Sequence, residues 1–278
     1  MQNLKDSRKN PGDFDLTGKT AVVTGAAGFL GRYFCKALAC HGAQVVAADI
    51  SRNIRPVTRA LEGLYPSKIL GVACDVSSPK SVKSMIRQTL NRYGRVDILL
   101  NNAATKSSDL RAYFAPFEKY SLSQWRKVMA VNIDGVFLAA QAAGTQMTRQ
   151  RGGGSIIQVA SIYGVVAPDQ RIYKGSRHGG RPINTPAVYS ASKGAVVALG
   201  RYLAAYWADK HIRVNTLVPG GIESGQNRAF IKKYSNRVPM ARMGSPLDLT
   251  GAVVYLASDA SLYMTGQEIV VDGGLTAW

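Results

Sequence analysis

The strongest constraint on the fold is a regular alternation between short apolar segments and amphipathic helical patterns. Buried-strand patterns occur at residues 20–24, 44–49, 69–74, 96–100, 155–160 and 212–217. The intervals carry helical patterns, which are clearest at residues 30–38, 79–93, 122–149 and 187–208. Repeated strand–helix units of this kind form a parallel sheet with helices on both faces. The sequence therefore predicts an α/β fold with one doubly wound parallel sheet of about seven strands.

The chain has 278 residues, and no linker rich in proline, glycine or serine divides it. We expect residues 1–278 to form a single domain, with residues 1–15 as a flexible N-terminal extension. The polar start does not match a signal peptide and no later apolar run is long enough to span a membrane, which favours a soluble cytoplasmic protein. Cys35, Cys40 and Cys74 lie in apolar patterns without metal-ligand spacing, so we expect buried thiols and no metal site.

Net charge is the outlier in composition. The chain has 35 Lys and Arg against 17 Asp and Glu, a formal charge of +18, and this excess favours an anionic partner. Nucleic acid is one candidate, but the basic residues are scattered and no nucleic-acid-binding motif accompanies them. We therefore consider nucleic acid an unlikely partner, and a basic surface that serves solubility is the simpler interpretation.

Three glycines, Gly25, Gly28 and Gly31, follow the first strand and open the first helix. Glycine lets the backbone approach a ligand closely, and the free amides and dipole of the helix start favour a pyrophosphate. Asp49 ends the second strand, where a carboxylate would accept hydrogen bonds from an adenosine ribose. This favours NAD over NADP as cofactor, although Arg52 could instead pair with a 2′-phosphate.

A tyrosine and a lysine four residues apart, Tyr189 and Lys193, share one face of the predicted helix 187–208. A phenol is a poor base at neutral pH, but a neighbouring cation favours the phenolate and lowers the pKa of the tyrosine. The pair alone also fits an ordinary solvated helix face. Its significance comes from the polar residues, such as Asp75, Asn102 and Ser161, that follow other strands, because ligands bind at these strand ends.

Taken together, these residues resemble the short-chain dehydrogenase/reductase family over residues 16–274, which implies a Rossmann-type fold. The resemblance rests on Thr24-Gly25, Asp75-Val76, Asn101-Asn102-Ala103, Asn132, Ser161, Tyr189-x-x-x-Lys193, Arg213-Val-Asn215, Pro219-Gly220, Thr265-Gly266 and Asp272-Gly273-Gly274. It implies that Tyr189 is the general acid/base, that Ser161 holds the substrate oxygen and that Asn132 holds a water in a proton relay. Lys193 would bind the nicotinamide ribose and lower the tyrosine pKa.

The resemblance also implies two wider sets of residues. Those that would bind the cofactor are Gly25, Gly28, Phe29, Leu30, Gly31, Asp49, Ile50, Asp75, Val76, Asn102, Ala103, Ala104, Tyr189, Lys193, Pro219, Gly220 and Ile222. Those that would contact the substrate are Ser161, Tyr163, Arg171, His178, Tyr189 and Gly221. The implied activity is NAD(P)-dependent interconversion of a secondary alcohol and a ketone.

Two features depart from the family pattern. Phe29 stands where classical members carry a glycine, and the glycine spacing matches extended members, many of which act on nucleotide sugars. The rest of the chain looks classical. Ser161 and Tyr189 are 28 positions apart, which implies an insert at about residues 168–186. This insert and residues 225–247 are rich in Lys and Arg, and we hypothesise that they flank the active site and hold an anionic or sugar-derived substrate.

Other functions remain open from sequence alone. A non-catalytic module that binds a cofactor or nucleic acid could use the same fold, and the glycine spacing also fits a nucleotide-sugar epimerase or dehydratase. The resemblance further implies a homo-oligomer, a dimer or a homotetramer, that pairs the helices near residues 122–149 and 187–208 and buries residues 275–278 at a contact.

Overall fold

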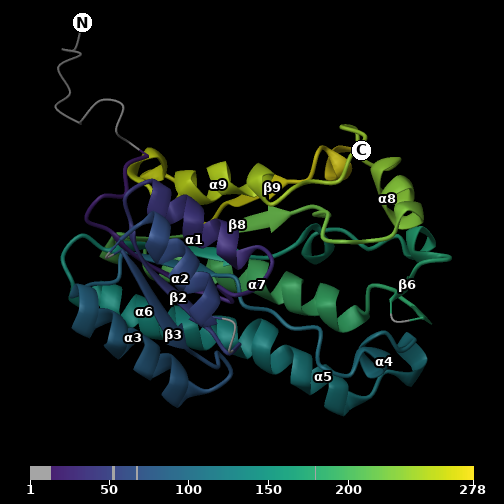
Figure 1. The fold of residues 1–278 in the computed structure, drawn as a ribbon, viewed down its shortest axis with the longest axis horizontal. Coiled ribbons are helices and arrows are strands. Elements are labelled where there is room, and N and C mark those ends of the chain that lie inside the picture. Colours follow the sequence, from purple (N-terminus) through teal and green to yellow (C-terminus); the bar gives the residue numbers. More distant parts are fainter. Residues whose placement is uncertain (1–13, 52–53, 67, 179) are drawn as a thin grey trace, which may run out of the picture.

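Seven parallel strands form a single sheet in the order β3-β2-β1-β4-β5-β8-β9, which confirms the predicted fold class (Figure 1). The computed structural model describes residues 14–51, 54–66, 68–178 and 180–278, so most of the expected N-terminal extension lies outside the described residues. The strands are β1 (Thr20–Thr24), β2 (Gln44–Asp49), β3 (Ile69–Ala73), β4 (Ile98–Asn101), β5 (Gly154–Val159), β8 (Ile212–Pro219) and β9 (Glu268–Val271).

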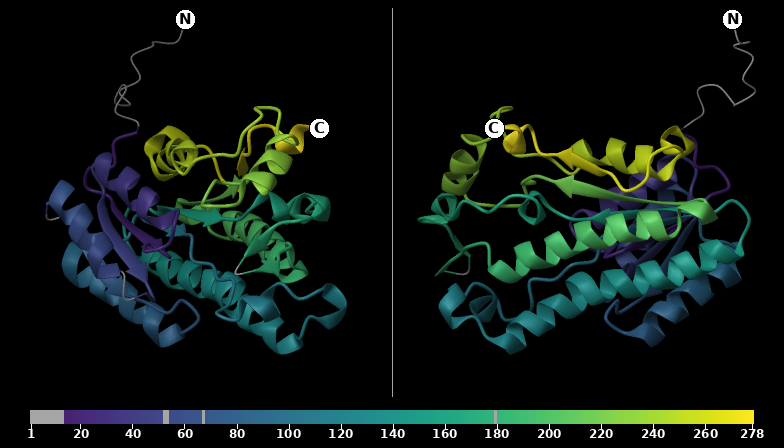
Figure 2. Two further views of the ribbon diagram at one scale, coloured as in Figure 1. Left: turned by 45° about the vertical axis from the view of Figure 1, so that its right-hand side comes forward. Right: turned by 180° about the vertical axis from the view of Figure 1, so that it is seen from behind.

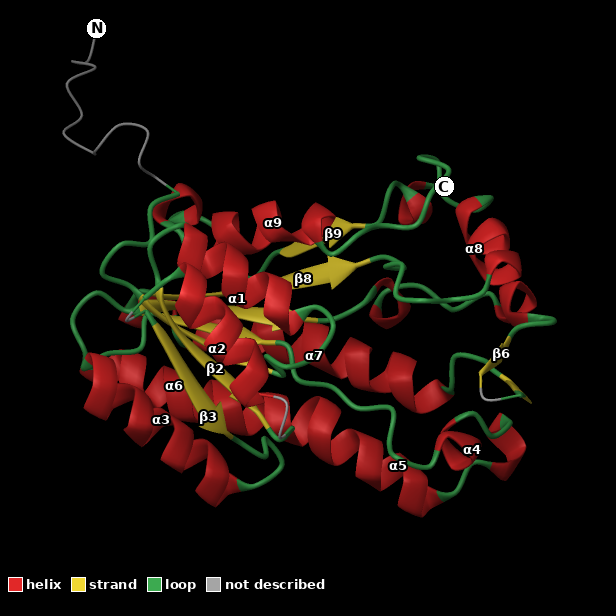
Figure 3. Cartoon of the chain, viewed as in Figure 1, coloured by secondary structure: helices red, strands yellow, loops and turns green. Residues whose placement is uncertain are grey.

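Helices cover both faces of the sheet, because the strands are apolar on both sides and cannot face water. One layer contains α1 (Gly31–Cys40), α2 (Ile54–Leu64) and α9 (Leu247–Ala257). The other contains α3 (Pro79–Tyr93), α6 (Gly135–Arg149) and α7 (Ala187–Tyr206). Figures 2 and 3 show the two helical layers with the sheet between them.

The strand order reverses at β1, which pairs with β2 on one side and with β4 on the other. From this point the chain winds outward in both directions, so the loops that follow β1 and β4 diverge. Ligands of doubly wound sheets bind in the crevice that this divergence opens at the carboxyl ends of the strands.

Shorter elements gather beyond the carboxyl ends of the strands, at the right of Figure 1. They include α4 (Leu110–Tyr113), α5 (Leu122–Met129), α8 (Arg228–Ser235) and a hairpin of β6 (Arg177–His178) and β7 (Arg181–Pro182). The 3₁₀ turns are Phe117–Lys119, Ile162–Gly164, Gln170–Tyr173, Ala208–Lys210, Asp259–Ser261 and Leu275–Ala277. The hairpin and the turn Gln170–Tyr173 lie within residues 168–186, where the sequence predicts an insert.

Residues Leu122–Arg149 form a helical segment that is long and apolar enough to cross a membrane by length and composition alone. The sequence search for apolar runs missed it. Within this segment, the Ala139 and Met147 side chains of α6 are buried in a cluster with side chains of α3 and the sheet. These contacts are those of a core helix in an α/β domain.

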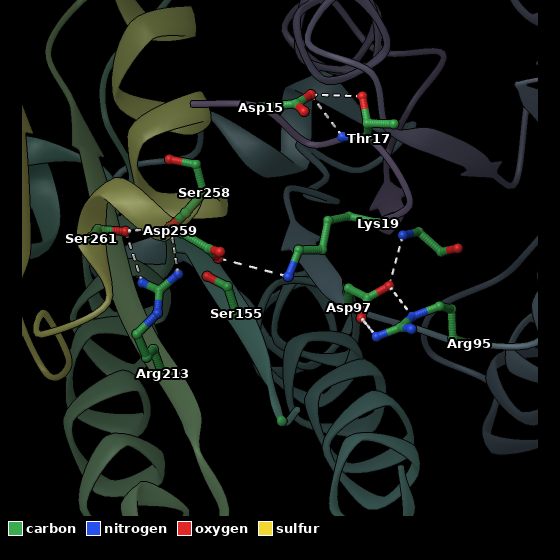
Figure 4. A network of polar contacts seen from close by, with 12 residues as sticks. Asp15, Thr17, Lys19, Arg95, Asp97, Ser155, Arg213, Ser258, Asp259 and Ser261 are labelled. Atoms are coloured by element: carbon green, nitrogen blue, oxygen red, sulfur yellow. Dashed lines mark hydrogen bonds and ion pairs between the residues drawn. The ribbon is translucent and has the colours of Figure 1, made fainter. Parts of the chain in front are cut away.

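A polar network holds the amino-terminal ends of the strands together (Figure 4). Asp97, which is only 5% exposed, accepts hydrogen bonds from the Thr20 backbone N–H at 2.8 Å and from Arg95 Nε at 2.7 Å. Arg213 of β8 donates to the carbonyl oxygen of Ser258, beyond the end of α9, at 3.1 Å. These hydrogen bonds stabilise the amino-terminal ends of the strands, which lie opposite the crevice.

The cysteines match the expectation only in part. Cys35 and Cys74 are buried, and burial raises the pKa of the Cys35 thiol to about 12, which makes it a poor nucleophile and metal ligand. Cys40, at the end of α1, is exposed, so the prediction of a buried thiol was wrong there. Among the described residues, no group of three or more His, Cys, Asp or Glu side chains could hold a metal ion.

Candidate active site

A cavity of about 450 Å³ lies at the carboxyl ends of the central strands. Its lining includes residues from the loops after β1, β4, β5 and β8, together with α7 and the insert. The predicted site residues that line it are Phe29, Leu30, Asn102, Ala104, Ser161, Tyr163, Tyr189, Lys193, Pro219, Gly220, Gly221 and Ile222. The structure therefore brings together residues that are up to 193 positions apart in the chain.

Tyr189 and Lys193 lie one turn apart on α7 and both face this cavity. Lys193 is 5% exposed, and its ammonium donates a hydrogen bond of 2.7 Å to the carbonyl oxygen of Val159. Burial lowers the pKa of Lys193 to about 8. Burial also raises the pKa of Tyr189, and the Ser161 hydroxyl offsets only part of this increase. Burial therefore determines the direction of the Tyr189 pKa shift in the free protein, and the expectation that Lys193 lowers this pKa stays a prediction.

Ser161 leaves the end of β5 and caps a short 3₁₀ turn, where its Oγ accepts a hydrogen bond from the Tyr163 N–H at 3.2 Å. This turn packs directly against the backbone of α7. A Cβ at Gly164 would lie only 2.6 Å from the carbonyl carbon of Lys193, so only glycine permits the approach. The close contact fixes the position of Ser161 relative to the helix that carries Tyr189.

Asn132 is fully buried in a π-helical turn, Ala130–Asp134, between α5 and α6. Its Oδ1 accepts from the Thr105 N–H at 2.8 Å, and its Nδ2 donates to Ser192 Oγ at 3.2 Å. Single π-helical turns inside α-helices occur frequently at functional sites. The side chain therefore ties the loop after β4 to the residue next to Lys193, and it lies outside the cavity lining.

The loops after β1 and β4 are held together by Asn102. Its Nδ2 donates to the carbonyl oxygens of Thr24 at 3.0 Å and Gly25 at 3.2 Å, and its N–H donates to Thr24 Oγ1 at 3.0 Å. The Ala103 N–H also donates to Thr24 Oγ1, at 3.1 Å. These bonds set the shape of the glycine loop.

The glycine loop requires its glycines. Gly25 has a positive φ of 68°, and a Cβ there would lie 2.8 Å from Ala103 Cα. A Cβ at Gly31 would lie 2.1 Å from the carbonyl oxygen of Gly25. No side chain caps the start of α1 at Leu30, although the Arg32 and Tyr33 N–H groups already donate to the carbonyl oxygens of Gly28 and Leu30, so a ligand would have to use amides that precede Arg32. The loop therefore fits a pyrophosphate at the start of α1.

Asp49 ends β2 beside this loop. Its Oδ2 accepts a hydrogen bond from the Ala27 N–H at 2.9 Å and its Oδ1 accepts from the Ser51 N–H at 2.7 Å. Both bonds fix the carboxylate, and each oxygen keeps a further lone pair for a ribose hydroxyl. Arg52, the alternative partner for a 2′-phosphate, lies outside the described residues.

The remaining predicted cofactor residues lie outside the cavity lining. Asp75 Oδ1 accepts from the Ser77 hydroxyl at 2.6 Å and shapes the loop after β3. Val76 is buried, whereas Ile50 is 72% exposed. Gly25, Gly28, Gly31, Asp49 and Ala103 likewise form the loops around the cavity rather than its wall.

The loop after β8 is closed by α8, which lies within residues 225–247, the segment that the sequence predicted to flank the active site. Tyr234 of α8 accepts a hydrogen bond of 2.5 Å at its Oη from the Gly221 N–H, and its ring leaves no room for a Cβ at Gly221. Phe230, one turn earlier on α8, lines the cavity and packs its ring 5.2 Å from that of Tyr173. Thus α8 and the insert contact each other at the entrance.

Among the side chains that the structure describes, the basic ones of the insert and of residues 225–247 do not line the cavity. The Arg171 side chain is 90% exposed and pairs with Asp169 at 2.9 Å, and Arg237 approaches the same carboxylate at 3.4 Å. Arg242 pairs with Asp248 at 2.8 Å. The structure therefore places Arg171 away from the predicted substrate position. The His178 side chain lies outside the described residues.

Sequence reasoning missed several lining residues, including Lys106, Tyr113, Phe114, Asn184, Thr185, Gln226 and Phe230. The lining contains no Asp or Glu, and Lys106 is its one exposed basic residue among those described. Asn184 and Thr185 could have been noticed, because they immediately precede Pro186 and the helix that carries Tyr189. No comparable signal marks Tyr113 or Phe230.

A glycine loop at the reversal point of a doubly wound sheet, beside a cavity with Tyr, Lys and Ser, defines a dinucleotide-dependent oxidoreductase. The family model described as short chain dehydrogenase matches residues 19–235, so the chain belongs to the short-chain dehydrogenase/reductase family. Similar proteins cover nearly the whole chain. The D-threitol dehydrogenase of Mycolicibacterium smegmatis is 35% identical over 95% of each chain.

Other relatives differ in what they act on. A 3-oxoacyl-(acyl-carrier-protein) reductase of Thermotoga maritima is 33% identical over 94% of this chain and 98% of that protein. The galactitol 2-dehydrogenase (L-tagatose-forming) of Cereibacter sphaeroides is 32% identical over 95% of this chain and 98% of that protein. Family membership alone therefore leaves the substrate open.

Solved structures show the same fold. A short-chain type dehydrogenase/reductase from Mycobacterium marinum has a TM-score of 0.83 at 35% identity and covers 96% of this chain and 98% of its own. A gluconate 5-dehydrogenase from Burkholderia cenocepacia, in complex with NADP and tartrate, has a TM-score of 0.82 at 33% identity and also covers 96% of this chain and 98% of its own. A short chain dehydrogenase from Leptospira borgpetersenii with bound NAD+ has a TM-score of 0.81 at 32% identity, and the match covers 96% of each chain.

Proposed function

We propose that this protein is an NAD-dependent dehydrogenase that interconverts a secondary alcohol and a ketone in a small uncharged polyol. The observation that carries the proposal is the convergence of Ser161, Tyr189 and Lys193 on one cavity whose other polar groups are mostly neutral hydroxyls and amides. Two relatives are named for polyols, D-threitol and galactitol, which supports this substrate class.

The proposed chemistry follows from the proton that must leave the alcohol. Nicotinamide, when bound, accepts or donates the hydride. Tyr189 Oη would take the proton from the substrate hydroxyl, and Ser161 Oγ would hold that oxygen in place. The raised Tyr189 pKa means that the phenol stays protonated in the free protein, so a positive charge near Oη would have to favour the phenolate before Tyr189 can act as a base.

Lys193 is the source of positive charge that the chain itself provides. With a pKa of about 8, its ammonium is mostly protonated at neutral pH, and it lies one helical turn from Tyr189. A ribose hydroxyl could replace the Val159 carbonyl as a partner of Nζ. Lys193 would then orient the cofactor and favour the phenolate together.

The proposed preference for NAD rests on Asp49. Its fixed carboxylate suits the two hydroxyls of an adenosine ribose and would repel a 2′-phosphate. Structures of similar proteins with bound NAD+ and with NADP both exist, so the family does not decide this preference.

An uncharged substrate replaces the anionic one hypothesised from sequence. Three of the arginines that motivated that hypothesis, Arg171, Arg237 and Arg242, pair with Asp169 or Asp248 and do not line the cavity. The direct test is a screen of polyols and aldonates with each cofactor, followed by nicotinamide absorbance. Turnover of a polyol with NAD+ supports the proposal, whereas turnover of aldonates alone would contradict it and favour an anionic substrate.

We also propose a homo-oligomer through the outer faces of α6 and α7. Phe137 of α6 is 46% exposed, and Tyr202 and Tyr206 of α7 are each 62% exposed with their rings stacked at 5.8 Å. A single chain leaves this apolar surface in water, and a second copy would cover it. Light scattering can measure the molar mass of the protein and of the Tyr206→Glu variant. The variant should have a lower molar mass, because a buried charge at the contact would destabilise the oligomer. Trp278, expected at a contact, is 80% exposed in the single chain.

A further inference from the structure

The insert adds its own wall to the substrate cavity. Tyr173, Ile183, Asn184 and Thr185 all line the cavity, whereas Arg171 does not. Hydrogen bonds join the beginning of the insert to its end. The Tyr173 and Thr185 hydroxyls hydrogen bond at 2.5 Å, and Gln170 Nε2 donates to the Thr185 carbonyl oxygen at 2.8 Å. The inner face of the insert is therefore an ordered surface of neutral polar groups.

Asn184 leaves one polar atom of this wall without a partner. Its Nδ2 donates to the carbonyl oxygen of Phe114 at 3.1 Å. Because a carbonyl can only accept, this bond determines the orientation of the amide and turns Oδ1 away from Phe114. Oδ1 is buried and has no hydrogen-bond partner among the residues that the structure describes.

Tyr163 contributes a second such atom. It follows Ser161 in the 3₁₀ turn, and its hydroxyl is also buried, near Tyr173 but with no partner in hydrogen-bond geometry among the described residues. Burial and the neighbouring Tyr173 and Tyr234 raise the pKa of Tyr163, so the hydroxyl stays neutral and can both donate and accept. Tyr163 lines the same cavity as Ser161, Tyr189 and Asn184.

We infer that Tyr163 and Asn184 form a subsite for a substrate hydroxyl other than the one that is oxidised. A buried polar group without a partner destabilises the free protein, and a ligand hydroxyl that pairs it removes that penalty. The subsite selects substrates with several hydroxyls over alcohols with few. Both oxygens are buried in the described structure, so a ligand must displace part of the wall to reach them. This inference rests on the proposed function.

The test is the substitution Tyr163→Phe, which removes one hydroxyl and keeps the ring. The quantity measured is the ratio of kcat/KM for D-threitol to kcat/KM for butane-2,3-diol, two four-carbon secondary alcohols that differ by the terminal hydroxyls. We expect this ratio to fall about 3- to 10-fold, as for the loss of one neutral hydrogen bond. Thermal unfolding without substrate should not shift downward, because the lost hydroxyl has no partner in the free protein.

Tyr93→Phe is the matched control, since Tyr93 at the end of α3 also has a buried, unpartnered hydroxyl and does not line the cavity. This control should leave the ratio unchanged. An unchanged ratio in Tyr163→Phe, or an equal loss on both substrates with a lower unfolding temperature, overturns the subsite and leaves the proposed function intact. If the unmodified enzyme oxidises neither compound nor any other polyol with either cofactor, the proposed function fails and the subsite fails with it.

Discussion

The Lys193 ammonium donates a hydrogen bond of 2.7 Å to the Val159 carbonyl oxygen, and this contact joins α7 to the carboxyl end of β5. Ser161 follows Val159 by two residues, and Tyr189 precedes Lys193 by one helical turn. The bond therefore helps to set the distance between the serine and the tyrosine that are proposed to hold the same substrate oxygen. It also keeps a charged group in a buried position, which has a measurable consequence.

That consequence is a pH-dependent stability. The pKa of Lys193 falls from 10.5 to about 8 on folding, so between these values the unfolded chain binds more protons than the folded one. Stability must then rise with pH across this window. Relative to Lys193→Met, we expect the free energy of unfolding of the cofactor-free protein to rise by about 2 kcal/mol from about pH 7 to about pH 9.5. Urea unfolding at both pH values measures this. Parallel pH dependence of the two proteins would show that Lys193 keeps its ordinary pKa.

A second prediction concerns the contact between the Ser161 turn and α7. In Gly164→Ala the new Cβ would lie 2.6 Å from the Lys193 carbonyl carbon, so the turn and helix must separate. We expect a loss of about 1–3 kcal/mol of stability and a lower kcat. Gly63→Ala in α2 is the control, because nothing lies within 4 Å of its Cβ; it should raise stability by about 0.5–1 kcal/mol. An active, fully stable Gly164→Ala protein would disprove the close approach.

A third prediction concerns cofactor choice. In Asp49→Asn the carboxylate loses its charge and one of the two backbone bonds that hold it. We expect the Kd of NAD+ to rise about 10- to 100-fold, as for the loss of a charge-assisted hydrogen bond, with a smaller effect on NADP+. Titration with both cofactors measures the change in their ratio. Equal changes in the Kd of NAD+ and of NADP+ would mean that Asp49 does not bind the adenosine ribose.

The fold was predictable because it depends on local patterns. Six of the seven strands carry apolar runs that the sequence shows directly, and their alternation with helices determines a parallel sheet. The seventh, β9, has no long apolar run and was located only within the closing motif of the family. The residues at strand ends were also visible, since each follows a clear strand.

The rest of the site depends on contacts between distant segments. The direction of the Tyr189 pKa shift in the free protein could not be predicted, because spacing on a helix reveals the neighbouring lysine but not the burial that raises this pKa. The position of the insert beside the cavity could be predicted, but the partners of its charged side chains could not. Its charges are obvious in the sequence, whereas the pairing of Arg171 and Arg237 with Asp169 exists only in three dimensions.

The central claim is that Tyr189 transfers the proton during oxidation of the substrate. Tyr189→Phe removes only its hydroxyl, and no described hydrogen bond that holds the fold depends on that oxygen. The most direct measurement is kcat for a polyol together with the Kd of NAD+ in this variant. We predict a loss of about 10²- to 10⁴-fold in kcat with nearly unchanged cofactor binding. A variant that binds NAD+ and retains most of its activity would contradict the assignment.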